Sequence, residues 1–231
     1  MMHADTALRR WTLFGVAILI AACGGGGGSS SDSVTAGIDR GGIVTATGSI
    51  TGFGSVHVNG VHYVTTGATI TLDDNPGSES ELRVGQVVRI EGRLDQDGLN
   101  GTATRVSFDD EVEGPVQSID LANSRMVVLG RTVQVSVQTS FDDGISPRSL
   151  EGVAVGDRIE VSGLVTTTGV VEATRIERKT AQSSVEVKGT IASLDTNARS
   201  FALGQLTVSY ASAQLNGFAG GQPANGDVVE A

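Results

Sequence analysis

Two histidines, His57 and His62, are the side chains in this sequence best suited to binding a transition metal. They flank Asn59-Gly60, a dipeptide typical of two-residue hairpin turns. With that turn the imidazoles lie directly opposite each other on one β face, and with a Gly60-Val61 turn they are diagonal neighbours; in either register we expect them to be exposed. A zinc or copper site needs three or four ligands, and no further ligand is in obvious reach. We therefore predict a solvated polar face without metal, with a site at His57 and His62 as the alternative.

Three acidic turns offer carboxylate oxygens, the ligands that calcium prefers. They span residues 73–79, 109–111 and 142–144. The first lacks the spacing that puts a bidentate glutamate at the twelfth position of an EF-hand loop. The Pro76-Gly77 and Asp143-Gly144 pairs are also ordinary turn formers. We therefore interpret the three segments as acidic turns, with a weak calcium site as the alternative.

Nothing in the sequence predicts catalysis. Cys23 is the only cysteine, and neither His57 nor His62 lies in a serine or aspartate motif of a nucleophilic enzyme. Glycoside hydrolysis needs a pair of carboxyl groups in a cleft, and domains as small as these are not expected to form a deep cleft. We predict that the protein is not an enzyme and that it uses no cofactor.

The first 22 residues have the layout of a secretory signal peptide. Arg9 and Arg10 precede an apolar run from Trp11 to Ile20, and small residues follow the run. About 20 apolar residues are needed to cross a bilayer as a helix, so this run is too short for a transmembrane span. We therefore expect residues 1–22 to be removed on export.

The junction after this run is Ile20-Ala21-Ala22-Cys23, which resembles the lipobox of bacterial lipoproteins. The resemblance implies diacylglycerol on the Cys23 sulfur, cleavage before Cys23 and acylation of the new amino group. Several acyl chains on one residue give stable anchoring. Gly24 stands where an aspartate would resemble an inner-membrane retention signal. We therefore expect a lipid-anchored envelope protein in the outer membrane, facing the periplasm or the cell surface.

The net charge of the chain disfavours two classes of binding partner. It carries 26 Asp and Glu against 16 Lys and Arg, a formal net charge of −10. Nucleic acids and anionic lipid headgroups select clustered Lys and Arg, so this balance disfavours both. The partners that we expect are the membrane, through the lipid anchor, and an unknown envelope protein or glycan.

A short motif recurs along the rest of the chain. Residues 84–92 (VGQVVRIEG) match residues 155–163 (VGDRIEVSG) at an offset of 71, and a third copy begins at residues 225–230 (NGDVVE). Before the first repeat, a Gly/Ser-rich run cannot bury apolar surface and is expected to be a flexible tether. The predicted organisation is a tether over residues 23–42 and three repeats over residues 43–110, 111–180 and 181–231.

Alternating Val-, Ile- and Thr-rich runs between Gly, Asn and Asp predict strands in each repeat. Hairpins around Gly130-Arg131 and Gly204-Gln205 put apolar residues on one face. These are Met126, Val128, Val133 and Val135 in the second repeat, and Phe201, Leu203, Leu206 and Val208 in the third. The pattern predicts an all-β chain of tandem small five-stranded OB-like β-barrels, with SH3-like barrels or small β-sandwiches as the alternative.

The lipobox, the Gly/Ser tether and the repeated V-G-D-x-(I/V)-E-V-x-G with a closing A-T-R-I-E resemble bacterial lipoproteins that carry the domain of unknown function 5666. The resemblance covers the chain from Ile43 onward. It implies a fold and carries no catalytic residues over to this sequence. We therefore predict an uncharacterised envelope-anchored interaction or structural module. A ligand- or metal-binding protein that uses OB-like faces or the two histidines is the alternative.

The third repeat is expected to be an incomplete barrel. The sequence stops at Ala231, just after the start of its V-G-D-type strand. The first two repeats continue past this point with a hairpin and a closing strand that ends at Val106 or Ile176. We expect this closing strand to be missing, through natural truncation or because a partner chain supplies it.

Overall fold

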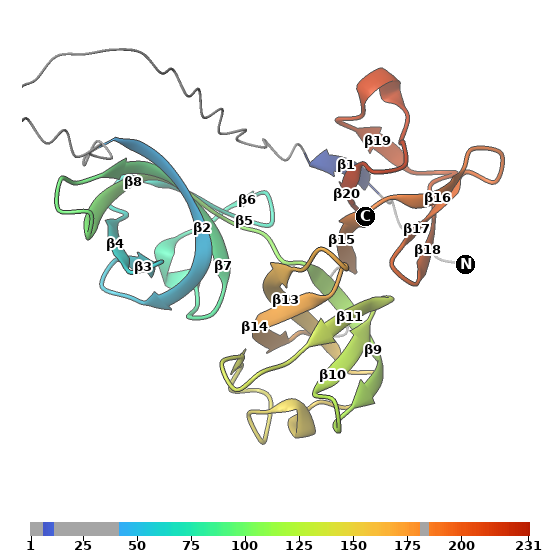
Figure 1. Cartoon of the computed structure of the whole chain (residues 1–231), viewed down its shortest axis with the longest axis horizontal. Coiled ribbons are helices and arrows are strands. Elements are labelled where there is room, and N and C mark those ends of the chain that lie inside the picture. The colour runs from blue at the N-terminus through green and yellow to red at the C-terminus, as the bar shows by residue number, and fades with distance from the viewer. Residues whose placement is uncertain (1–6, 12–41, 181–184) are drawn as a thin grey trace, which may run out of the picture.

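The computed structural model describes residues 7–11, 42–180 and 185–231, and their regular structure is almost entirely β (Figure 1). The exceptions are three single-turn 3-10 helices: η1 (Glu79–Glu81), η2 (Leu150–Gly152) and η3 (Ala219–Gly221). Among the described residues, no helix has the length and apolar character that a membrane span requires. Cys23 and the expected tether up to residue 41 lie outside the described residues. Of the expected signal peptide, only Ala7–Trp11 is described.

The first repeat is a closed five-stranded barrel. Its strands follow the order β4-β3-β2-β7-β8, and a parallel pairing between β4 and β8 closes the ring. Two short strands, β5 and β6, extend the sheet beside β8. The bounds are Ile43–Gly52 for β2, Val56–Val58 for β3, Val61–Val64 for β4, Thr69–Leu72 for β5, Asn75–Pro76 for β6, Val87–Leu94 for β7 and Asn100–Phe108 for β8.

The second repeat has the same topology. Its ring is β10-β11-β14-β13-β9, closed by the pairing of β9 with β10, and the short β12 lies beside β14. In both barrels the third and fifth strands are parallel neighbours, as in the Greek-key barrel of OB domains, so the predicted OB-like fold is confirmed. The bounds are Val112–Asp120 for β9, Arg125–Val128 for β10, Arg131–Gln134 for β11, Ser140–Phe141 for β12, Arg158–Val165 for β13 and Val171–Arg178 for β14.

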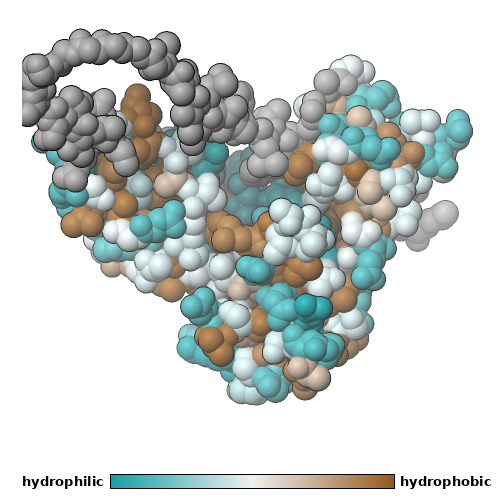
Figure 2. Space-filling model, viewed as in Figure 1, coloured by the Kyte–Doolittle hydropathy of each residue, from teal (hydrophilic) through white to brown (hydrophobic). Residues whose placement is uncertain are grey.

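The barrel interiors are filled by the inward-facing residues of the alternating strands. The apolar faces predicted for the two hairpins are correct. Met126, Val128 and Val133 are buried in the second repeat, and Phe201 and Leu203 are buried in the third. On the face visible in Figure 2, apolar residues are interspersed with polar ones. Burial of these alternating apolar faces therefore accounts for the fold.

The third repeat is a partial sheet and does not close into a barrel. Its strands β16, β17 and β18 form a separate three-stranded sheet, while β15 pairs with both β20 and β9 of the second barrel. The second and third repeats share one apolar core. The bounds are Glu186–Thr190 for β15, Ala192–Asp195 for β16, Ser200–Leu203 for β17, Leu206–Ser209 for β18, Gln214–Asn216 for β19 and Val228–Glu230 for β20.

One more strand, β1 (Ala7–Trp11), completes this partial sheet from the other end of the chain (Figure 1). It runs antiparallel to β20 and parallel to β19. In the second barrel the closing strand β14 has the same relation to β13 and β12. From the sequence we expected no segment of this chain to take the place of the closing strand, and we considered natural truncation or a partner chain instead. The structure differs because backbone pairing at a strand edge accepts a segment distant in sequence.

Candidate functional site

A row of glutamates crosses four neighbouring strands where the second and third repeats meet. Glu113 on β9 pairs directly with Glu160 on β13 and with Glu186 on β15. Glu160 in turn pairs with Glu177 on β14. Directly opposite residues of neighbouring strands point to the same face, and like charges in that position destabilise a sheet. The apolar neighbours Val112 and Val161 line the core, so the glutamates lie on the outer face of the second barrel.

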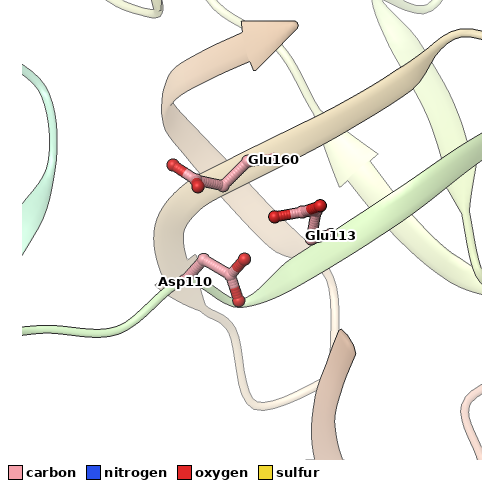
Figure 3. Close-up of side chains that lie close together, drawn as sticks. All are labelled: Asp110, Glu113 and Glu160. Carbon is pink, nitrogen blue, oxygen red and sulfur yellow. The ribbon is translucent and has the colours of Figure 1, made fainter. Parts of the chain in front are cut away.

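Three carboxyl groups in this region are removed from solvent. Asp110 precedes β9 in the linker between the first two barrels, and it is 2% exposed; Glu113 is 6% exposed and Glu160 3% exposed. Each offers an oxygen within 4.8 Å of the other two. Figure 3 shows their side chains close together, reaching from the linker, β9 and β13. We call these three residues the carboxylate cluster.

The linker and the third repeat cover this part of the barrel face. The backbone N–H of Glu111 donates to the carbonyl oxygen of Val161 at 2.9 Å, and that of Lys188 donates to the carbonyl oxygen of Glu111 at 3.1 Å. These bonds fasten the linker to β13 on one side and to β15 on the other. The cluster is therefore buried by the docking of the repeats.

Two lysines compensate part of the negative charge. Lys179 forms an ion pair with Glu160. Lys188 donates from Nζ to the backbone carbonyl oxygen of Asp110 at 2.5 Å, and its Nζ lies 3.5 Å from a carboxylate oxygen of Glu230. Lys188 also attracts the carboxylate of Asp110, and Lys179 attracts that of Glu113. Oδ1 of Asp110 and Oε1 of Glu113 are buried without a hydrogen-bond partner.

The surroundings favour the neutral form of several acidic groups. Burial raises the pKa of Glu160 to about 7, against the opposing attraction of Lys179. Burial and the neighbouring Glu230 raise the pKa of Glu186 to about 7. Burial raises the pKa of Asp109 to about 6 and that of Asp110 well above its ordinary value, although Lys188 lowers both. Burial therefore favours the neutral forms of Asp110 and Glu160, or a positive charge beside them.

The acidic turns predicted from the sequence are partly brought together. Asp110, from the turn at 109–111, belongs to the cluster, and its backbone N–H donates to Oδ1 of Asp73, from the turn at 73–79, at 3.2 Å. In the turn at 142–144, Asp143 forms an ion pair with Arg148 instead.

Glu113 and Glu160 were not recognised as candidates from the sequence. A weak signal was available for Glu160, because two of the three copies of the repeated motif, the second and the third, have a glutamate at this position (Glu160 and Glu230), whereas the first has Arg89.

His57 and His62 lie directly opposite each other, as the Asn59-Gly60 turn predicts, with ring centroids 4.7 Å apart. They are half-buried rather than exposed. The ring nitrogens of His62 are both engaged, Nε2 with the carbonyl oxygen of Gly54 at 2.9 Å and Nδ1 with Oδ1 of Asn100 at 3.3 Å. Within the described residues the two histidines are not joined by a third metal ligand.

The edges of β19 and β20 form a second candidate site, which we call the strand slot. Arg9 of β1 is opposite Glu230 of β20, and Leu8 is opposite Leu215 of β19. By the repeat alignment, Glu230 and Leu215 correspond to Glu160 and Phe141 of the second barrel.

In the second barrel, Glu160 is opposite Glu177, and Phe141 is opposite the buried Ile176. On the β20 edge, Arg9 takes the place of Glu177, which puts Leu8 at the position of Ile176. On the β19 edge, Leu8 takes the place of Ile176 directly. The agreement of two independent registers shows that β1 follows the path of a closing strand.

Residues 41–107 and 113–177 match the model of a protein family described as Domain of unknown function (DUF5666). No curated protein and no solved structure matches the chain. The two matched segments include the strands of the two closed barrels, so each barrel is one copy of the family's domain.

Proposed function

The chain belongs to the DUF5666 family, and from this premise we propose that it is a non-catalytic, lipid-anchored protein of the cell envelope that binds an extended strand of a partner protein. The strand slot of the third repeat is the binding site in this proposal. The Cys23 anchor, with the tether behind it, holds the repeats at the membrane.

The observation that carries the proposal is the seating of β1 in the strand slot. Its backbone pairs on both sides, antiparallel to β20 and parallel to β19. Strand addition of this kind draws its affinity from main-chain hydrogen bonds and its specificity from alternate side chains. A suitable partner therefore presents an extended segment with an apolar residue at the Ile176-like position.

Export would make the strand slot available. Ala7–Trp11 belongs to the expected signal peptide, so cleavage before Cys23 would remove it. The edges of β19 and β20 would then present unpaired N–H and C=O groups, which pair readily with an incoming strand. In this scheme the signal peptide, which we call the leader, occupies the strand slot before cleavage, and a partner strand occupies it afterwards.

Hydrogen exchange tests the proposal on two forms of the protein. One is the full chain carrying Cys23→Ser, and the other begins at residue 23 with the same substitution. Val228–Glu230 and Gln214–Asn216 should exchange faster in the form without the leader. A synthetic peptide of residues 171–178 (VEATRIER), the closing strand of the second barrel, should restore protection.

The matched control is the same peptide with an aspartate in place of Ile176. It should bind at least about tenfold more weakly, because a charge would enter the core. Full protection of β20 without leader or peptide would mean that another segment fills the strand slot, and the proposal would be wrong. Equal binding of the two peptides would also contradict it.

A further inference from the structure

We propose that Asp110, Glu113 and Glu160 bind one calcium ion at the junction of the repeats. This site is separate from the strand slot and goes beyond the function proposed above. It uses none of the histidines that the sequence suggested as metal ligands.

The ligand set fits a hard cation. It consists of carboxylate oxygens, and within the described residues no imidazole or thiol joins the cluster. Nitrogen and sulfur ligands select zinc, copper and iron, whereas oxygen ligands select calcium, magnesium and manganese. The carboxylate cluster is therefore suited to a hard cation and not to the zinc or copper that His57 and His62 would bind.

The origin of the ligands favours calcium among the hard cations. The three oxygens lie within 4.8 Å of one another, close enough to share one cation. Magnesium demands nearly ideal octahedral geometry and tends to keep several of its waters, which a buried cluster does not readily provide. Calcium also tolerates irregular geometry, which suits ligands that come from a linker and two strands.

The buried oxygens without hydrogen-bond partners are suited to bind a cation. Asp110 and Glu113 are each more than nine-tenths buried, and each has a carboxylate oxygen that accepts no hydrogen bond. Glu113 is also directly opposite two glutamates, Glu160 and Glu186. Unpaired charges in such a place are strongly unfavourable, and a divalent ion would compensate them.

The nearby lysines do not take the place of this cation. Lys179 is engaged with Glu160, and the ammonium group of Lys188 contacts the Asp110 carbonyl oxygen and Glu230. Lys188 attracts Asp110 first and Asp109, Glu230 and Glu186 after it, and Lys179 attracts Glu160, Glu177 and Glu113. Each lysine is therefore shared among three or more carboxyl groups. The region therefore retains negative charge after both lysines are counted.

Calcium at this position would connect three parts of the chain. Asp110 belongs to the linker after the first barrel, and Glu113 and Glu160 belong to neighbouring strands of the second barrel. Because β9 also pairs with β15, the ion would stabilise the junction of all three repeats. A ligand that binds only the folded state raises stability with its concentration.

The test uses the full chain carrying Cys23→Ser, first treated with EDTA and then titrated with CaCl2 or MgCl2. We expect isothermal titration calorimetry to give one calcium per chain, and the midpoint of thermal unfolding to rise with calcium. Asp110→Asn and Glu113→Gln should each weaken calcium binding at least tenfold. Both substitutions keep the size of the side chain, and circular dichroism in EDTA checks that each variant is folded.

Glu91→Gln is the matched control, because Glu91 lies on β7, the strand of the first barrel that corresponds to β13, but its side chain is 42% exposed. This variant should bind calcium like the parent chain. No calcium binding at millimolar concentration would overturn the proposal. Unchanged binding in a folded Glu113→Gln variant, or tighter binding of magnesium than of calcium, would overturn it as well.

Discussion

Removal of the charge on Glu160 should stabilise the calcium-free protein at pH 8. The pKa of Glu160 is raised by burial from its ordinary 4.5 to about 7, so its ionised form is unfavourable in the folded state even with Lys179 beside it. A difference of about 2.5 pH units corresponds to about 3 kcal/mol, at about 1.4 kcal/mol per unit. Because the Glu160 side chain is only 3% exposed, solvent screening does not reduce this value much. Glu160→Gln should therefore gain up to about 3 kcal/mol.

The sign of the pH dependence follows from proton linkage. Between pH 4.5 and pH 7 the folded state holds a proton on Glu160 that the unfolded state has lost. The free energy of unfolding of the parent chain should therefore fall as the pH rises through this window. The gain in the Glu160→Gln variant should be near zero at pH 4.5 and complete by pH 8.

Urea unfolding in EDTA at pH 4.5 and pH 8 measures this gain. Glu177→Gln is the control, since Glu177 is next in the glutamate row but forms an ion pair with Arg175. We expect that variant to be neutral or destabilised. If Glu160→Gln destabilises the protein at pH 8, Lys179 compensates the buried charge fully and the reasoning is refuted. Lys179 itself is 30% exposed and can be hydrated when its partner is neutral.

Three further predictions concern other parts of the chain. Cys23→Ser should move the protein from the membrane to the soluble fraction, and a variant that stays in carbonate-washed membranes would contradict lipidation. Gly163→Ala should lower the free energy of unfolding by about 2 kcal/mol or more in urea unfolding, because the new Cβ would lie 2.5 Å from the Glu172 carbonyl oxygen; an unchanged midpoint would contradict this. The chain should keep no zinc or copper after dialysis, and metal that is retained in the parent but lost in His57→Ala would show that the histidine pair is a metal site.

Much of the fold could be predicted from the sequence because its signals are local. The alternation of apolar residues around Gly130-Arg131 assigns Met126 and Val133 to the inside of a barrel, and both are buried there. The Asn59-Gly60 turn fixes the register that puts His57 opposite His62. Turn residues and two-residue periodicity act within a few positions, so these features needed no knowledge of distant segments.

Local sequence signals could not predict which segment takes the closing-strand position of the third repeat. The repeat pattern led us to expect a closing strand after β20. That Ala7–Trp11 takes this position depends on the unpaired edges of β19 and β20, which exist only once those strands are assembled. Strand-edge pairing is made by the backbone, so no side-chain pattern in residues 7–11 predicted it.

The carboxylate cluster was decided by tertiary structure alone. The sequence determines that Glu91 and Glu160, on corresponding strands of the first two repeats, both point outward from their barrels. The Glu91 side chain remains 42% exposed and pairs with surface arginines, whereas the Glu160 side chain is 3% exposed. The difference arises because the linker and β15 dock on the outer face of the second barrel, cover Glu160 and its strand neighbour Glu113, and bring Asp110 to them. Alternation sets which side of a strand a residue occupies, but only the packing of distant segments decides whether that side meets water or another carboxylate.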